Sequence, residues 1–313
     1  MLKGKNNPAV SVIIPTYNRA HLIGKAIESV LNQTYQDFEI IVVDDCSIDN
    51  TKDIARSFQD DRIIYVRHDR NRGGSGTRNT GIEKSRSDLI AFLDNDNMWF
   101  KNKLERQVEV LDSLPSDFGA IYCGAFLKKG DKETYFPPDE FRPVEGNILG
   151  DLLERSFIDT SGMLIKREVF QVSGYFLEDL PRYQDWELCI RIAKHFKIKY
   201  LKEPLYYLSI TDKSISTDIR AGITAYKKIY EMHKEDLKTF GQKHKFEYTI
   251  GQSECLSGDF SAGKIFLLKS IKTKVFQLRP YLALAISLLG KSVHNKFYNA
   301  VINIVAKPAP REK

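Results

Sequence analysis

Two aspartates, Asp94 and Asp96, stand on either side of Asn95 directly after an apolar run. Carboxylates this close together form a compact set of oxygen ligands, which suits Mg²⁺ or Mn²⁺ bridged to a diphosphate, with water at the remaining positions. A metal there would stabilise the negative charge that builds on a departing nucleoside diphosphate. The alternative is a solvated turn, since Asp and Asn favour turns. The position at a strand end favours the metal site.

A second acidic pair, Asp44 and Asp45, ends a neighbouring apolar run. A carboxylate at this place can accept a hydrogen bond from a nucleotide base or from a ribose hydroxyl. The helix that follows needs an N-cap, which Ser47 or Asp49 can supply. We therefore predict that Asp44 binds the nucleotide of a donor substrate and that Ser47 and Asp49 cap the helix.

The glycine-rich segment GGSG at 73–76 is followed by Arg78. It lacks the Gly-Lys-Ser/Thr ending of a P-loop and the GxGxxG order of a dinucleotide-binding fold. We interpret it as a flexible bend before a helix over 77–84, which lets Arg78 reach a bound donor. A plain loop at a helix start is the alternative.

The segment QDWEL at 184–188 opens an amphipathic helix. Its first acidic residue, Asp185, can be interpreted in two ways. It can cap the helix, or it can be a general base that takes the proton from an acceptor hydroxyl. Sugar hydroxyls are poor nucleophiles, so an inverting displacement needs such a base. Glu187 is the next candidate if Asp185 is not the base.

The elements that would position these residues follow from the alternation of apolar runs and helical periodicity in the first hundred residues. Strands are expected at 10–14, 39–43, 62–66 and 88–93, and helices at 22–31, 51–58 and 77–84. Such alternation predicts a parallel sheet covered on both faces, with ligands bound beyond the carboxyl ends of the strands. Those ends carry three polar clusters, at 15–18, 44–45 and 94–96, which are expected to converge.

The later part of the chain is less regular. Strands are expected at 160–165 and 198–207, with the helix from 185 between them and an excursion at 128–147 near the active edge. After residue 216 the pattern becomes helical, over 221–240, 248–256, 261–272 and 281–289. We therefore expect a catalytic domain over 1–217 and a helical region with a basic tail over 218–313.

Composition narrows the class of protein. The four cysteines, Cys46, Cys123, Cys189 and Cys255, are scattered and lack zinc-site spacing, which is typical of a reducing compartment. The amino terminus lacks the apolar stretch of a signal peptide. We expect a cytoplasmic protein, and we do not expect nucleic acid as a partner.

The net charge of +6 is unevenly distributed. Residues 264–313 hold ten Lys/Arg and one acid, a charge of +9, whereas residues 1–263 hold 37 basic and 40 acidic residues, a charge of −3. The apolar stretch at 281–289 is too short to span a bilayer. We predict that this region contacts an anionic membrane surface on its inner face, with Lys291 and Lys296 near the headgroups. The alternative is that 281–289 packs in a helical cap on the catalytic domain.

Five segments, in this order and spacing, resemble the motifs of family 2 glycosyltransferases. They are VSVIIPTYNR at 10–19, VVDDCS at 42–47, GTRNTGI at 76–82, LDNDN at 93–97 and QDWEL at 184–188. The resemblance covers roughly 8–217 and fades over the C-terminal third. It implies a GT-A α/β fold, in which a Rossmann-like, mostly parallel sheet is flanked by helices, here with a C-terminal helical extension. It also implies a nucleotide-diphosphate sugar donor, Mn²⁺ or Mg²⁺, and inversion at the anomeric carbon.

By position, the resemblance assigns donor-binding roles to Pro15, Thr16, Tyr17, Asn18, Asp44, Arg78, Asp94 and Asn95. Thr16 and Tyr17 would hold the base, with Tyr17 stacked on it, and Asp44 would bond the base edge. Arg78 would support the nucleotide.

The resemblance also divides the remaining roles. Asp94 and Asn95 would face the ribose and the diphosphate, Asp96 would be the main metal ligand with Asp94 beside it, and Asp185 would be the catalytic base. The family often has acids at the positions of Asn97 and Gln184, and a His or Arg where Lys213 is the nearest cation.

The Gln-x-x-Arg-Trp motif of processive members is absent, which favours addition of single sugars. We expect transfer to a saccharide or lipid-linked saccharide in the synthesis of a cell-surface polysaccharide or glycolipid. One alternative is a polyprenyl-phosphate sugar synthase, whose acceptor is a phosphate. Another is a catalytically silent scaffold that binds partners through its C-terminal helices.

Overall fold

The computed structural model describes residues 7–129, 132–138, 144–209 and 218–289. The chain forms two compact units, Met1–Ser214 and Ile215–Lys313. The expected domain boundary at 217 lies outside the described residues, as do Lys213, Lys291 and Lys296. No helix in the described ranges is long and apolar enough to cross a membrane.

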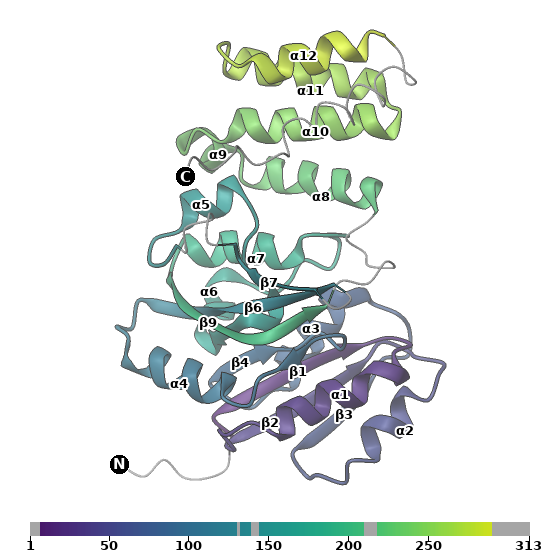
Figure 1. The fold of residues 1–313 in the computed structure, drawn as a ribbon, viewed down its shortest axis with the longest axis vertical. Helices are drawn as coiled ribbons and strands as arrows, with labels where there is room; N and C mark the ends of the chain where they lie inside the picture. Colours follow the sequence, from purple (N-terminus) through teal and green to yellow (C-terminus); the bar gives the residue numbers. More distant parts are fainter. Residues whose placement is uncertain (1–6, 130–131, 139–143, 210–217, 290–313) are drawn as a thin grey trace. The chain divides into compact units, whose positions relative to one another are not determined.

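The first unit is built on a nine-stranded sheet in the order β3-β2-β1-β4-β8-β6-β9-β5, with β7 paired to β6 (Figure 1). Its first four strands are all parallel: β1 (Val10–Thr16), β2 (Phe38–Asp44), β3 (Ile63–Arg67) and β4 (Leu89–Phe92). Every residue of β1 and β2 is buried, as expected for parallel strands covered on both faces. This half carries the three polar clusters at its carboxyl ends.

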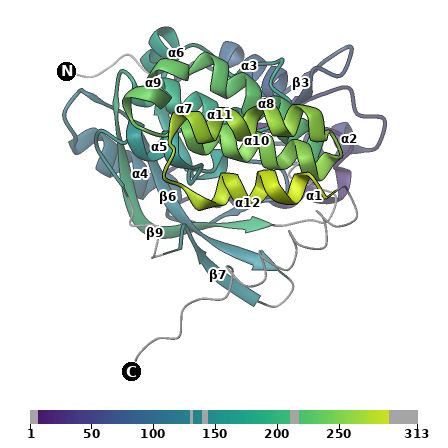
Figure 2. The same ribbon diagram turned by 90° about the horizontal axis from the view of Figure 1, so that it is seen from above.

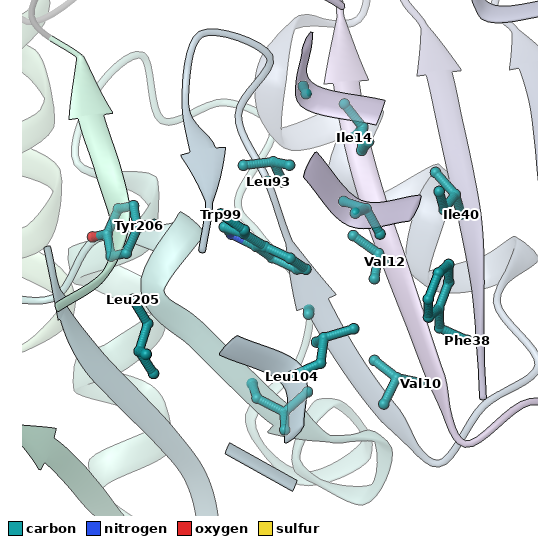
Figure 3. Packing of buried hydrophobic residues seen from close by; sticks show 14 of the residues in the cluster. Val10, Val12, Ile14, Phe38, Ile40, Leu93, Trp99, Leu104, Leu205 and Tyr206 are labelled. Carbon is teal, nitrogen blue, oxygen red and sulfur yellow. The ribbon is translucent and has the colours of Figure 1, made fainter. Parts of the chain in front are cut away.

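Alternation along the strands sends side chains to two helical layers. Val10, Val12 and Ile14 face a cluster with α1 (Ala20–Leu31) and α4 (Lys103–Ser113), shown in Figure 3. Ile13 points the opposite way, toward α3 (Gly73–Lys84), where a Cβ on Gly81 would come within 2.4 Å of its side chain. Only glycine allows α3 to approach the sheet this closely.

The second half of the sheet is mixed rather than parallel. β8 (Met163–Lys166) runs antiparallel to β4 and to β6 (Phe118–Lys129), whereas β6 and β9 (Lys197–Ser209) are parallel. β5 (Met98–Trp99) and β7 (Lys132–Phe136) add antiparallel edges to β9 and β6. The antiparallel pairing of β8 with β4 brings the segment before β8 next to the site described below.

Shorter helices complete the first unit: α2 (Thr51–Arg56), α5 (Leu149–Glu154), α6 (Arg167–Ser173) and α7 (Gln184–Ala193). The side chain of Trp186 on α7 is buried, and its Nε1 donates to the Leu152 carbonyl at 2.6 Å. This bond ties the start of α7 to α5. It therefore fixes the position of the neighbouring Asp185.

The second unit is helical, with α8 (Ile219–Met232), α9 (Lys234–Thr239), α10 (Lys243–Ser257), α11 (Phe260–Thr273) and α12 (Leu278–Ser287). α10, α11 and α12 lie side by side in Figure 2. α10 ends at Gly258 in the left-handed region, and the Asp259 carboxylate accepts the Ala262 N–H to cap α11. Gly251 and Gly263 let α10 and α11 pack backbone against backbone.

The expected elements are present, with four corrections. Residues 73–76 are the first turn of α3 rather than a flexible bend. The strand expected at 160–165 begins with the 3₁₀ turn η1 (Thr160–Gly162), and β8 follows it. The helix expected over 221–240 breaks at His233 into α8 and α9. Within the excursion at 128–147, residues 132–136 form β7.

Candidate active site

The polar clusters meet at the carboxyl ends of β1, β2 and β4. Thr16 is the register partner of Asp44, and the Asp45 N–H donates to the Thr16 carbonyl at 2.9 Å. On the other side of β1, the Asn95 amide donates to the Pro15 carbonyl at 2.9 Å. The expected convergence is confirmed for these segments.

Thr16 and Tyr17 present unused binding groups at this edge. The Thr16 hydroxyl is buried and has no hydrogen-bond partner among the described residues. The Tyr17 side chain is 48% exposed, which is unusual for a large aromatic beside a buried strand. A buried hydroxyl without a partner is costly, and a bound polar ligand would remove that cost.

Asn18 is occupied in joining two loops. Its φ of 51° is in the left-handed region, which asparagine tolerates. Its N–H donates to the Ser47 hydroxyl at 2.8 Å, and its Oδ1 accepts the Ile48 N–H at 2.9 Å. Asn18 therefore holds the loop after β1 against the loop after β2, and in doing so it positions Tyr17.

Asp44 is buried, and both carboxylate oxygens have protein partners. Oδ1 accepts the Ser47 N–H at 2.8 Å, and Oδ2 accepts the Tyr65 hydroxyl. Burial, and then this bond, raise the pKa of Tyr65. Ser47 does not cap α2 as expected; Asp49 reaches that helix instead, accepting the Thr51 N–H at 3.1 Å.

Asp45, to which the sequence assigned no role, organises the start of α3. Its Oδ1 accepts the Arg72 N–H and its Oδ2 accepts the Gly73 N–H, both at 2.8 Å. A carboxylate at a helix N-terminus satisfies free N–H groups and interacts favourably with the helix dipole. His68 contacts the same carboxylate at 2.7 Å. Asp45 thus satisfies N–H groups at the start of α3 and stabilises the helical turn at 73–76.

Arg78, on the second turn of α3, is a buried cation of the site. One Nη donates to Asp94 Oδ1 at 2.5 Å, and the guanidinium lies 5.6 Å from the centre of the Phe176 ring. Its Nε is buried without a partner among the described residues. Burial lowers the Arg78 pKa, but Asp94, Asp185 and Asp159 together outweigh it, so the pKa is raised. Arg78 is therefore a permanent positive charge with one unused donor.

Asp94 and Asp96 form the acidic end of β4. Burial, and then the charge of Asp94, raise the pKa of Asp96, while Arg19 and Arg78 act in the opposite direction. Arg19 is a cation near the site that sequence reasoning did not single out, although it directly follows Asn18. Asn97 is structural: its amide donates to the Ser161 hydroxyl, and its Oδ1 accepts the Ser209 N–H. An ionised aspartate could only accept a hydrogen bond from the Ser161 hydroxyl, not donate one.

Asp185 lies in the first turn of α7. Its Oδ1 accepts the Trp186 N–H at 2.8 Å, and Tyr183, not Asp185, is the N-cap residue. Burial raises the pKa of Asp185, with a smaller contribution from Asp94, and Arg78 opposes both. The Asp185 carboxylate is therefore close enough to Arg78 and Asp94 for their charges to change its pKa.

Glu187, the second candidate for a base, is fully committed elsewhere. It is buried, and Arg191 donates to it through Nε at 2.8 Å and through Nη at 2.7 Å. Arg191 also donates to the Tyr175 carbonyl at 2.7 Å. This ion pair holds the loop after α6 and leaves Glu187 no freedom to act as a base.

Asp159 is a further carboxylate of the site that the sequence did not reveal. It accepts the Ser161 N–H at 2.9 Å and the Tyr206 hydroxyl at 3.2 Å. The Ser161 hydroxyl in turn accepts the Asp94 N–H at 3.2 Å. Burial, then Asp94 and Asp185, raise the Asp159 pKa to about 7. The residue lies in no motif, and the antiparallel entry of β8 places it here.

This shift predicts a pH-dependent stability. In the unfolded chain Asp159 has its ordinary pKa of 3.8, whereas in the folded chain its pKa is about 7. The folded state therefore binds the proton more tightly, and the free energy of unfolding falls as the pH rises from 3.8 to 7. Asp159→Asn keeps an acceptor for Ser161 and Tyr206 but carries no charge. Without metal, we expect it to be more stable than wild type at pH 8 by on the order of 2–4 kcal/mol.

Urea denaturation in EDTA at several pH values measures this difference, which should vanish below pH 3.8. Asp61→Asn, at an exposed aspartate near the opposite, amino end of β3, is the control and should show no such gain. A stability difference that does not change with pH would contradict the assignment of a raised pKa to Asp159.

A cavity lies at the amino ends of the strands, away from this cluster. It has a volume of about 870 Å³ and is lined by residues at the amino ends of β1 and β4, including Pro8, Arg86 and Asp88. Ligands of parallel α/β sheets bind at the carboxyl ends instead. We therefore assign the candidate active site to the cluster of Thr16, Arg78, Asp94, Asp96 and Asp185, not to this cavity.

An acidic strand end, an arginine and a buried carboxylate thus meet at the carboxyl edge of an α/β sheet, the edge at which ligands of such sheets bind. The family model of glycosyl transferase family 2 matches residues 11–174, and this chain belongs to that family. The expected family membership is confirmed.

Relatives with sequence similarity carry glycosyltransferase names. A glycosyltransferase of Rickettsia felis is 36% identical over 218 residues, covering 67% of this chain but 36% of its own length. The chain thus spans about a third of that relative. TuaG of Bacillus subtilis, named for teichuronic acid biosynthesis, is 32% identical over 215 residues, covering 67% of this chain and 82% of its own.

Solved structures are similar in fold. TarS 1–349 of S. aureus, in complex with UDP-GlcNAc, has a TM-score of 0.69 at 18% identity, covering 93% of this chain and 92% of its own. The mannosyltransferase PcManGT of Pyrobaculum calidifontis, in complex with GDP-Man and Mn²⁺, has a TM-score of 0.62 at 17% identity, covering 97% and 89%. The expected GT-A fold, a sheet flanked by helices with a C-terminal helical extension, is confirmed.

Proposed function

We propose that this protein is an inverting glycosyltransferase that moves one sugar from a nucleotide-diphosphate sugar to an acceptor hydroxyl. The observation that carries the proposal is the gathering of an arginine, three acidic groups and a buried unpaired hydroxyl at one strand edge of a family 2 chain. These are the groups that donor binding, charge stabilisation and proton removal require.

The donor site would lie over β1 and β2. The exposed Tyr17 ring offers a stacking face for the base, and the Thr16 hydroxyl offers an unused hydrogen-bonding group. Asp44 would act at the base edge by exchanging one of its present partners, and Pro15, Asn18 and Asn95 would support the loops. Arg78 would place its charge, and its unpaired Nε, beside the phosphates.

Asp96 and Asp94 would hold Mn²⁺ or Mg²⁺. The described residues contain no group of three or more His, Cys, Asp or Glu that could hold a metal by themselves. Two carboxylates fit a hard cation that takes its remaining ligands from the diphosphate and water. When bound, the metal would neutralise charge on the departing nucleoside diphosphate. The surplus of negative charge around Arg78 also favours a cation here.

Asp185 would accept the proton of the acceptor hydroxyl as that oxygen attacks the anomeric carbon. Its carboxylate is held by the Trp186 N–H on a helix start that is itself anchored to α5. The raised pKa strengthens it as a base when it is ionised. Attack opposite the leaving diphosphate inverts the anomeric centre. A direct displacement of this kind needs one base and no nucleophilic side chain.

The relatives suggest the product. TuaG is named for teichuronic acid biosynthesis, and TarS and PcManGT were solved with UDP-GlcNAc and GDP-Man. We propose a cytoplasmic enzyme that adds single sugars to a saccharide or lipid-linked saccharide of a cell-surface polysaccharide or glycolipid. Acceptor choice would depend on segments such as 128–147.

A thermal-shift screen of UDP- and GDP-sugars with Mn²⁺ tests the proposal. A donor at 100 times its dissociation constant should stabilise the protein by about 2.7 kcal/mol. The donors that stabilise the protein should then be hydrolysed slowly without acceptor and transferred with one. A protein that binds no nucleotide sugar, or that binds one and neither hydrolyses nor transfers it, would instead be a scaffold.

A further inference from the structure

The turn between α11 and α12 exposes apolar side chains to an unusual degree. Phe276 is 98% exposed and Leu278 is 81% exposed, and Val275 beside them is exposed as well. Large apolar side chains gathered at one tip usually mark a contact surface rather than chance exposure.

The turn has a defined shape that keeps Phe276 outside. The Gln277 N–H donates to the Val275 carbonyl at 3.0 Å, and the Gln277 amide contacts His244 Nε2 at 2.9 Å. His244 is buried at the start of α10, and its carbonyl accepts the Ser270 hydroxyl of α11 at 2.8 Å. Contacts with His244 of α10 therefore hold the turn in place, with Phe276 at its tip.

The helix that follows buries small side chains and exposes several large ones, while Leu284 and Ile286 are partly buried. Pro280, Ala283 and Ser287 are buried in α12. The exposed apolar residues recur with helical spacing on one stripe: Leu278, Tyr281, Leu282, Ala285, Leu288 and Leu289. An amphipathic helix packed only against its own protein would show the opposite distribution.

The surface around the turn is positively charged, which favours an anionic partner. Residues 260–289 contain five cations, Lys264, Lys269, Lys272, Lys274 and Arg279, and no Asp or Glu. Lys272, Lys274 and Arg279 are exposed on both sides of Phe276. A recess of about 470 Å³ beside the turn is lined by Lys245, Tyr248, Phe276, Gln277, Leu278 and Arg279. Two cations and a phenol around such a recess suit a phosphate headgroup.

We propose that the α11–α12 turn, Val275 to Leu278, inserts into an anionic phospholipid bilayer, with α12 lying in the plane of the interface. The helix has 10 residues, so it is about 15 Å long and cannot span a hydrocarbon core of about 30 Å. An apolar stripe with flanking cations is the pattern of an interfacial helix. This surface belongs to the second unit, whereas the donor site belongs to the first, and the proposal does not depend on the activity proposed above.

Co-sedimentation of the full-length protein with phosphatidylcholine vesicles, with or without phosphatidylglycerol, tests the contact. We expect binding only to the anionic vesicles, release at high salt, and a loss of roughly tenfold or more in Phe276→Ser/Leu278→Ser. Phe240→Ser is the matched control, since Phe240 is a 45% exposed phenylalanine of the same unit. It should bind as wild type does.

A fluorescent variant reports insertion directly. The two native tryptophans, Trp99 and Trp186, are buried, so in Phe276→Trp the new indole is the exposed one. Its emission should shift to the blue on anionic vesicles and be quenched by brominated lipid. Unshifted emission in vesicle-bound protein, equal losses in the control variant, or equal binding to neutral vesicles would overturn the proposal. So would a dimer that the double serine variant abolishes without any vesicle binding.

Discussion

Asp185→Asn is expected to abolish sugar transfer while leaving donor binding intact. Asparagine keeps the size of the side chain and an acceptor for the Trp186 N–H, but it cannot take a proton. A general base contributes about 10²–10⁴-fold, so we expect the turnover number to fall by roughly a thousandfold. Transfer measured with saturating donor and acceptor gives this loss, and a thermal shift by the donor shows that binding survives.

The pH dependence provides a second measurement of the same claim. Asp185 acts when ionised, and burial raises its pKa. Wild-type turnover should therefore fall toward acid, with a midpoint above the ordinary aspartate value of about 3.9. The residual rate of the asparagine variant should lack this acid limb.

Glu187→Gln is the matched control for the base. Its native carboxylate is buried and paired with Arg191, so the variant should lose stability, by about 3–5 kcal/mol if the pair is fully broken. The fraction that folds should transfer sugar at a normal rate. If Asp185→Asn transfers within a few-fold of wild type while folded Glu187→Gln does not, the assignment of the base is wrong.

The fold was largely predictable because β1, β2 and β4 are predominantly apolar runs that end in polar clusters. Local pattern is enough there, since parallel pairing brings the carboxyl ends to one edge. The first turn of α3 was not predictable, because four residues rich in glycine are poor helix formers. The carboxylate of Asp45, 28 residues before Gly73, accepts the Arg72 and Gly73 N–H groups at the start of this turn.

The candidate site shows the same division. Arg78, Asp94 and Asp185 lie in segments that resemble family motifs. Once the chain folds, the two aspartates act on the pKa of Arg78. Asp159 has no local signal, because it gains its place through β8 running antiparallel to β4. Glu187 stood beside Asp185 in the sequence as a possible equivalent, yet Arg191, one helical turn later, commits it to structure. The contacts that each side chain makes in the folded chain, rather than its residue type, distinguish Asp185 from Glu187 as a candidate base.

Asp96→Ala is expected to reduce transfer at least a hundredfold, a loss of about 2.7 kcal/mol of transition-state stabilisation. Removing this carboxylate takes away the main proposed ligand of the divalent metal, so charge on the leaving diphosphate would be poorly compensated. The assay is sugar transfer in excess Mn²⁺, and wild type in excess chelator should show a comparable loss.

The same variant should fold at least as well as wild type when no metal is present. Burial and Asp94 raise the pKa of Asp96, so the ionised carboxylate costs stability as the pH rises through that value, and alanine removes the cost. Mn²⁺ with a nucleoside diphosphate should raise the melting temperature of wild type and of the control Asp61→Ala, but not that of Asp96→Ala. Full wild-type activity in chelator would refute metal dependence. An active Asp96→Ala that still gains stability from Mn²⁺ would move the ligand role to Asp94 or Asp159.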